Sequence, residues 1–126
     1  MSVQPDSPAP SRARLRSAAL LGALAVAAGA FGAHALRGRI PDERLATFDT
    51  AAKYQLAHAV LLAALAYAPV HPIAPRLITA GTIVFSGTLY ALVLLDLPVL
   101  GAVTPLGGLM LIAGWLCLLL DTARRA

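Results

Sequence analysis

Charged residues are scarce in this chain of 126 residues: Lys, Arg, Asp and Glu together make up 13% of it, and hydrophobic residues make up 59%. A typical soluble domain is about a quarter charged. A single domain of this length cannot bury so much apolar surface in its own interior. We therefore expect the lipid bilayer to be the solvent of this protein.

Cysteine is almost absent, and the single residue Cys117 excludes both an internal disulfide and a paired-cysteine metal site. The sequence also lacks a phosphate-binding glycine loop, a nucleophile–base motif, paired carboxylates and a metalloprotease helix motif. We therefore predict a non-enzymatic protein with no catalytic residue, no metal and no cofactor. The basic residues flank apolar runs instead of forming one patch, which argues against nucleic acid as a partner.

Four long apolar runs are present, and we predict membrane spans at about 17–36, 52–69, 76–96 and 104–121. Twenty helical residues cover roughly 30 Å, the thickness of the hydrocarbon core. The second run is short on its own, but the polar segment before it carries an apolar stripe at Leu45, Phe48 and Ala52. We expect this segment to be an amphipathic, interfacial extension of the second helix. The predicted fold is all-α, a bundle of four transmembrane helices over residues 17–123.

Residues 1–16 combine three prolines with the basic stretch "RARLR", and we predict a disordered basic tail there. A secretory signal cleaved at "AHA" (33–35) is the rival interpretation, but the apolar run is longer than the usual 7–15 residues of such signals. With four spans, one side of the membrane holds Arg12, Arg14, Arg16, Arg76, Arg124 and Arg125, and the other holds Arg37, Arg39, Arg44 and Lys53. The excess of positive residues predicts that both termini are cytoplasmic.

Two histidines, His34 and His58, are the ionisable side chains that lie within the predicted spans away from charged ends. Polar groups inside a bilayer usually have a role. We predict a polar cluster that joins neighbouring helices, with the members His34, Tyr54, Gln55, His58, Ser86 and Tyr90. The alternative is a haem or metal site through the two histidines. Because a metal usually needs three or four ligands, hydrogen bonding is the preferred interpretation.

The third predicted span carries hydroxyls on one helix face, at Thr79, Thr82, Ser86 and Tyr90. We expect this stripe to pack against a neighbouring helix, and a polar path through an oligomeric channel or carrier is the alternative. Small residues allow close approach of membrane helices. We predict such contacts at Gly29, Gly32, Gly87, Gly107 and Gly108.

Four blocks of this sequence resemble, in order, domain-of-unknown-function family 423, the YgdD-like small membrane proteins. The blocks are "GAFGAHAL" (29–36), "FDTAAKYQLAHAVLLAAL" (48–65), "VFSGTLYAL" (84–92) and "VTPLGGLMLIAGWL" (103–116). The resemblance covers about residues 17–120 and implies four membrane helices in a bacterial plasma (inner) membrane. Its recurrent positions would be Gly29, Gly32, His34, Phe48, Tyr54, Gln55, His58, Ser86, Gly87, Tyr90, Pro105, Gly107, Gly108 and Trp115. It assigns no activity, substrate or cofactor.

The residues and the resemblance together predict a structural or interaction protein of the membrane. Membrane lipid, a second copy of the chain or another membrane protein are the expected partners. A small oligomeric channel or carrier is the first alternative function, and a haem- or metal-binding subunit through His34 and His58 is the second.

Overall fold

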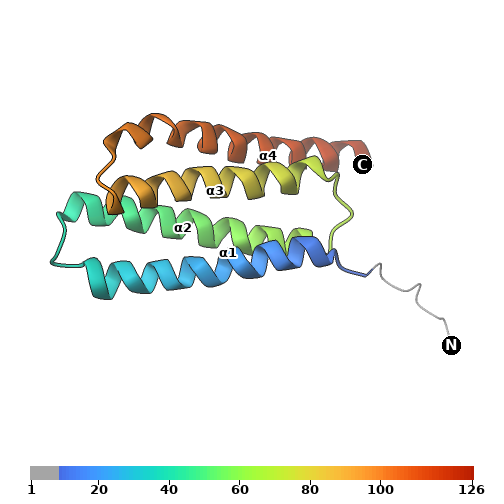
Figure 1. Cartoon of the computed structure of the whole chain (residues 1–126). Helices are drawn as coiled ribbons and strands as arrows, with labels where there is room; N and C mark the ends of the chain where they lie inside the picture. The colour runs from blue at the N-terminus through green and yellow to red at the C-terminus, as the bar shows by residue number, and fades with distance from the viewer. Residues whose placement is uncertain (1–8) are drawn as a thin grey trace.

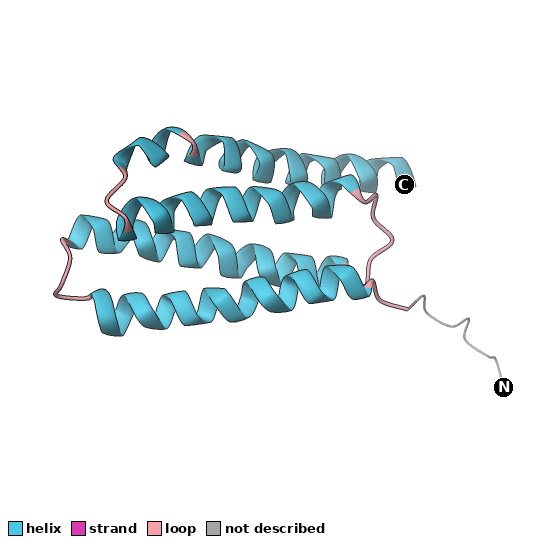
Figure 2. Ribbon diagram, in the orientation of Figure 1, coloured by secondary structure: helices cyan, strands magenta, loops and turns pink. Residues whose placement is uncertain are grey.

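The structure is a computed structural model that describes residues 9–126. Over these residues the chain forms helices joined by short loops, with no strand (Figure 2). The elements are α1 (Arg12–Phe31) with a π-helical extension η1 (Gly32–Leu36), α2 (Asp42–Leu65), α3 (Ile73–Leu94), a 3-10 turn η2 (Pro98–Ala102) and α4 (Thr104–Arg125). The all-α prediction is confirmed.

The helices run up and down as an antiparallel bundle, with α2 and α3 between α1 and α4 in the view of Figure 1. Each helix packs on the next one along the chain. One apolar core draws on all four helices, at Ala18, Leu21, Ala59, Leu62, Leu65, Ile78 and Leu111. Large apolar side chains also remain exposed on the outside of every helix, among them Leu20, Val60, Ile83 and Leu119. This pattern suits a bundle surrounded by lipid instead of water.

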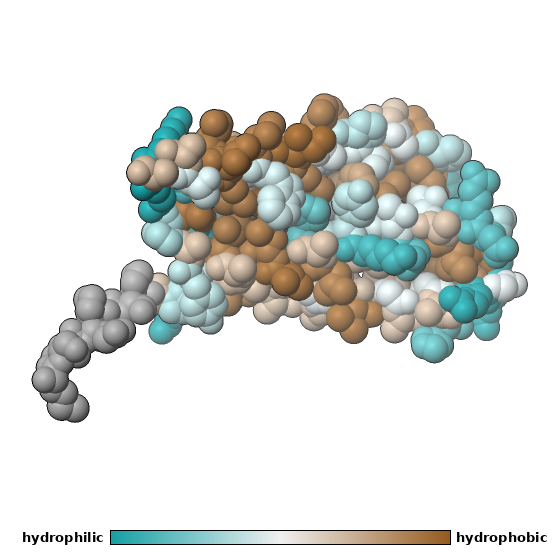
Figure 3. All heavy atoms as spheres, turned by 180° about the vertical axis from the view of Figure 1, so that it is seen from behind, coloured by the Kyte–Doolittle hydropathy of each residue, from teal (hydrophilic) through white to brown (hydrophobic). Residues whose placement is uncertain are grey.

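Three helical stretches of the described chain are long and apolar enough to cross a membrane: Arg12–Leu36, Ile73–Leu94 and Pro98–Arg125. Seen from behind, apolar atoms cover much of the surface, and hydrophilic atoms gather toward the two ends, with some reaching the middle (Figure 3). The stretch α2 is not among the three because its first half carries charges from Asp42 to Lys53. The predicted polar extension and the second apolar run form this one continuous helix.

The first helix begins at Arg12, earlier than the sequence predicts. Residues 12–16 are therefore helical, and the predicted disordered tail is wrong for them; residues 1–8 lie outside the described residues. Contacts with the loop after α2 order this turn. The backbone N–H of Ser11 donates to the carbonyl of Ala66 at 2.8 Å, and the Ser11 hydroxyl caps the helix by accepting from the N–H of Arg14.

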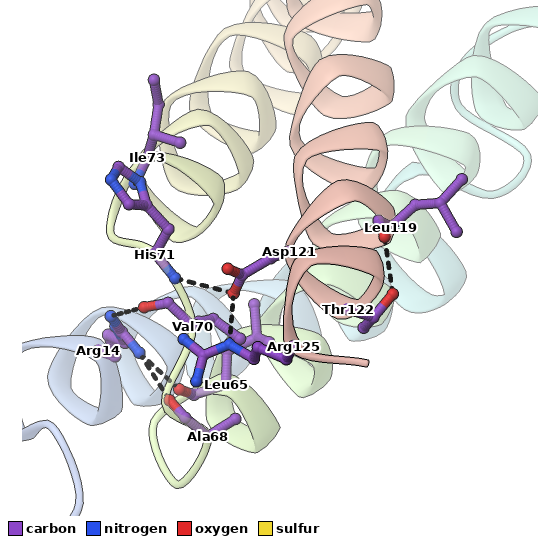
Figure 4. Close-up of polar contacts among 10 residues, drawn as sticks. All are labelled: Arg14, Leu65, Ala68, Val70, His71, Ile73, Leu119, Asp121, Thr122 and Arg125. Carbon is purple, nitrogen blue, oxygen red and sulfur yellow. Dashed lines mark hydrogen bonds and ion pairs between the residues drawn. The ribbon is translucent and has the colours of Figure 1, made fainter.

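Arg14 caps the C-terminal end of α2 (Figure 4). Its guanidinium donates to the carbonyls of Leu65 at 2.8 Å, Ala68 at 3.2 Å and Val70 at 3.3 Å. Helix ends leave carbonyls without intrahelical partners and carry a partial negative charge, so a cation there is stabilising. We call this side of the bundle, formed by the start of α1, the loop 66–72 and the end of α4, the Arg14 end.

Arg44 makes the corresponding contact for α3 at the opposite side, which we call the Arg44 end. Its guanidinium donates to the carbonyl of Val93 at 2.7 Å and pairs with Asp96 at 3.0 Å. Asp96 has a φ of 52°, in the left-handed region where helices commonly end, and the N–H of Leu97 donates back to the carbonyl of Leu92. The sequence predicts both arginines only as topology determinants. In the structure they also cap the C-terminal ends of α2 and α3.

The closest helix approach joins α3 to α4 at glycines. A Cβ on Gly107 would lie 2.4 Å from the backbone nitrogen of Phe85, and one on Gly81 would lie 2.9 Å from that of Leu111. Between α1 and α2, a Cβ on Gly32 would lie 3.1 Å from the ring of Phe48. Gly81 and Gly107 therefore need to be glycine because a side chain would collide with the facing backbone, whereas a side chain at Gly32 would require the Phe48 ring to shift slightly.

The other predicted packing glycines have room for a side chain. A Cβ on Gly108 would make only an ordinary contact with the ring of Phe85, at 3.8 Å, and one on Gly29 or Gly87 would meet nothing within 4 Å. Gly29 and Gly87 therefore do not lie at the contacts predicted for them. Gly87 is exposed and Gly29 is half-buried, because the rotation of each helix points these positions away from its neighbours. Glycine spacing alone does not define that rotation.

Replacing Gly107 by alanine should separate α3 from α4, whereas the same change at Gly108 should be tolerated. We expect Gly107→Ala to lower the free energy of unfolding by about 1–3 kcal/mol, the usual cost of overpacking. Gly108→Ala should change it by less than about 1 kcal/mol, in either direction. Thermal unfolding in mild detergent, followed by circular dichroism, measures both; equal effects would contradict the close α3–α4 contact.

Candidate functional site: a polar network centred on α2

Gln55 lies at the centre of the bundle and bonds to two neighbouring helices. Its side-chain nitrogen Nε2 donates to the backbone carbonyl of Leu21 on α1 at 2.8 Å, and its oxygen Oε1 accepts from the hydroxyl of Tyr90 on α3 at 2.8 Å. Only 4% of Gln55 is exposed. One almost completely buried amide group thus links α1, α2 and α3.

Ser86 adds a second bond between α3 and α2. Its hydroxyl donates to the backbone carbonyl of Ala51 at 2.8 Å, one helical turn from Gln55. Ser86 and Ala51 are both almost completely buried. A carbonyl oxygen has two lone pairs and can accept this bond in addition to its helical one.

His58 connects α2 to α4. Its Nδ1 lies 2.7 Å from the carbonyl oxygen of Tyr54, and the indole Nε1 of Trp115 lies 3.2 Å from its Nε2. A carbonyl can only accept and an indole N–H can only donate, so Nδ1 carries the proton and Nε2 accepts. Both nitrogens of the neutral ring are thereby used. The imidazole also meets the indole edge-on, with ring centroids 6.2 Å apart.

His34 lies apart from this network. It is exposed on η1, beyond Gly32, which packs against Phe48. His58 instead lies near the level of Gly22, whose nearest neighbour across the contact is Ala59. From that level to His34 the helix advances about twelve residues, roughly 18 Å. The structure therefore does not place His34 in the predicted polar cluster.

The same separation removes the geometric basis for a haem or metal site shared by His34 and His58. Metal–nitrogen bonds of about 2 Å require two ligand nitrogens of one ion to lie within about 4 Å of each other. Within residues 9–126, no group of three or more His, Cys, Asp and Glu side chains is placed to hold a metal ion. The two histidines therefore do not fit such a group.

The hydroxyl stripe of α3 is bonded within the bundle. Thr79 and Thr82 donate to carbonyls of their own helix, those of Pro75 and Ile78, while Ser86 and Tyr90 bond to α2. In the described part of the chain, every buried side-chain nitrogen and oxygen atom has a hydrogen-bond partner. Ser86 and Tyr90 therefore form the expected contact with a neighbouring helix, whereas the hydroxyls of Thr79 and Thr82 are bonded within α3 itself.

Two further contacts were not foreseen from the sequence. Trp115 as the partner of His58 is one, and the 2.8 Å bond between the hydroxyls of Thr88 and Thr104 is the other. Tyr54, predicted as a cluster member, contributes its carbonyl to His58 and packs its ring at a tilt against Phe85, with centroids 4.7 Å apart. No local sequence pattern indicates pairs that are this far apart in the chain.

Chemically, the network holds helices together and offers no reactive pair. The Ser86 hydroxyl is bonded to a carbonyl and not to a base, and both nitrogens of His58 are occupied. Apolar helices with internally satisfied polar groups define the class of small helical membrane proteins.

Within that class, the chain belongs to the family described as "Protein of unknown function (DUF423)", whose profile matches residues 28–108. It is 42% identical over 116 residues to a UPF0382 membrane protein of Staphylococcus aureus (strain bovine RF122), covering 85% of this chain and 95% of the relative. It is 38% identical over 108 residues to the UPF0382 membrane protein YwdK of Bacillus subtilis, covering 80% and 88%. No solved structure matches significantly. The predicted family and membrane class are confirmed.

His58→Ala should destabilise the bundle, and His34→Ala should not. Loss of the Trp115 partner and of buried ring volume should lower the free energy of unfolding by about 1–3 kcal/mol for His58→Ala. His34→Ala should change it by less than about 0.5 kcal/mol, as for other exposed positions. The fluorescence of Trp115, the only tryptophan, reports the local contact and should shift only in His58→Ala. Equal losses in both variants would contradict the assigned network.

Proposed function

We propose that this protein is a non-enzymatic component of the bacterial inner membrane, which acts by binding other molecules at its lipid-facing surface. The observation that carries this proposal is the polar network on α2, because its polar atoms are already hydrogen-bonded to backbone carbonyls and to other side chains of the bundle. Gln55, Ser86 and His58 have their polar atoms committed to bonds between or within helices. Lipid, a second copy of the chain and another membrane protein are the proposed partners of the outer surface.

The proposal includes α2 as a fourth membrane-spanning helix. It has 24 residues, which cover roughly 36 Å and exceed the hydrocarbon thickness. Its polar side chains Gln55 and His58 point into the bundle, where they are buried. A helix shielded by its neighbours does not need the hydropathy of one surrounded by lipid, since intramembrane polar residues are found on the bundle-facing side.

The charged side chains on the outer face of α2 lie in its first half. Lys53 and Asp49 form an ion pair at 2.7 Å, and both are largely exposed. Lys53 is about five residues, roughly 8 Å, further into the bundle than Phe48, which packs near the end of α3 at Val93. A lysine at this depth can extend its chain toward the Arg44 end, where Asp49 accompanies it.

A channel or carrier, the alternative function, has less support. Its expected polar path was the α3 stripe, and these hydroxyls bond to carbonyls and to Gln55. A solute path along them would need to break several buried bonds at once.

Cysteine mapping tests whether α2 crosses the membrane. In a Cys117→Ser background, single cysteines replace Gly38, His71 and Ala126, and intact cells are treated with a membrane-impermeant maleimide. We expect labelling at residue 38 without permeabilisation, and labelling at 71 and 126 only after it, because six of the ten positive residues lie at the Arg14 end. If positions 38 and 71 label from the same side, α2 does not cross and the proposal is wrong.

A further inference from the structure

A groove runs between α1 and α3 on one side of the bundle. Its main part, of about 490 Å³, has apolar walls that include Leu24 and Ile83, and a floor formed by α2. A second hollow of about 470 Å³ continues it toward the Arg14 end, and Ile83 lines both. Along α3 the two hollows extend from Pro72 to Leu94, and the stretch from Thr79 to Leu94 alone covers roughly 22 Å. This exceeds half of a hydrocarbon core of about 30 Å.

The hollow at the Arg14 end is cationic. Arg14 and Arg76 line it together with the hydroxyls of Ser11, Ser17 and Thr79, and no carboxylate is among its lining residues. Arg14 is held in place by the three carbonyls that it caps. Arg76 is exposed on the first turn of α3, and the ion pairs of residues 9–126 do not include it. Arg76 therefore lines the hollow without an ion-pair partner among the described residues.

The hollow at the opposite end of the bundle provides a contrast. It lies between α1 and α2, measures about 380 Å³, and combines Arg37 with the carboxylates of Asp42 and Asp49. Negative charge there disfavours an anion. The α1–α3 groove thus differs in having cations and hydroxyls at one end and apolar walls along the rest.

We propose that the α1–α3 groove binds one anionic phospholipid, an inference that rests on the proposed function. The headgroup phosphate lies at Arg76, with Arg14 and Ser17 beside it, and an acyl chain lies between α1 and α3. A guanidinium suits a phosphate because it offers paired N–H donors. Basic hollows between membrane helices at the cytoplasmic side recognise anionic headgroups. An apolar helix from another protein would leave this cationic end unmatched.

Gly87 provides a variant that fills the groove without disturbing the bundle. It lines the main part of the groove, and a Cβ at this position would meet nothing within 4 Å. Gly29 is the matched control, because a Cβ there also meets nothing within 4 Å but it lines the hollow between α1 and α2 instead. Leucine at either position should leave the fold intact, which circular dichroism and thermal unfolding check.

The test measures lipid retention by native mass spectrometry of the full-length protein in mild detergent. Phosphatidylglycerol and phosphatidylcholine with the same acyl chains are added separately to the original protein and to Arg76→Gln, Gly87→Leu and Gly29→Leu. We expect the original protein to prefer phosphatidylglycerol, and Arg76→Gln to weaken that preference roughly fivefold. Gly87→Leu should weaken binding of both lipids on the order of tenfold, because about two methylene groups of the acyl chain would lose their contact with the groove. Gly29→Leu should bind as the original protein does.

Equal retention of the two lipids by the original protein would overturn the proposal, as would equal behaviour of Gly87→Leu and Gly29→Leu. An unchanged preference in Arg76→Gln would overturn the headgroup assignment and with it the site. These outcomes are separate from failure of the proposed function, which appears in the cysteine mapping as positions 38 and 71 on one side. A protein with four confirmed spans and no selective retention would refute the lipid site alone.

Discussion

The hydrogen bonds of Gln55 are the interaction on which the rest of the structure depends. Its amide donates to the Leu21 carbonyl and accepts from the Tyr90 hydroxyl, so three helices are held at one depth and in one rotation. Apolar packing alone specifies helix rotation poorly in a bilayer, because lipid tails are as apolar as the side chains. A buried amide restricts the rotation of its helix more strongly, since rotating the helix about its axis would leave the polar atoms of the amide without partners.

The contacts around Gln55 follow from this alignment. Ser86 meets the Ala51 carbonyl one turn away on the same face, and His58 meets Trp115 toward the Arg14 end. The glycines of α3 and α4 then allow the last helix to approach closely, at Gly81 and Gly107. At the two ends, Arg14 and Arg44 bind the carbonyls that α2 and α3 leave open. The bundle thus combines a polar network and an apolar core between its helices with charged side chains at its ends and mostly apolar side chains on its outside.

Much of the fold could be predicted from sequence because it is encoded locally. Runs of apolar residues indicate the helices, and proline-rich stretches such as 69–75 indicate the turns. Gln55, His58, Ser86 and Tyr90 stood out because polar groups within apolar runs are rare. What sequence could not define is which side of each helix meets a neighbour. His34 and Gly29 lie in the same kind of small, apolar sequence as the packed positions, yet His34 is exposed and a Cβ on Gly29 would meet no neighbouring helix.

Long-range partners were also beyond the sequence. The pairing of Trp115 with His58, and of Arg14 with the end of α2, joins residues about fifty or more positions apart. The ordering of residues 12–16 has the same origin in part, since their helical turn bonds to the loop after α2 in addition to its local cap at Ser11. These contacts depend on the relative placement of helices, which only the folded structure supplies.

The most direct test of the central claim is a double-mutant cycle on Gln55 and Tyr90. The free energy of unfolding is measured in bicelles for the original protein, Gln55→Leu, Tyr90→Phe and the double variant. Loss of the Leu21 bond occurs in both Gln55→Leu variants and cancels. The account predicts a coupling energy of about 0.6–1.7 kcal/mol, the range of hydrogen bonds between membrane helices. Single effects that add to within about 0.3 kcal/mol would contradict it.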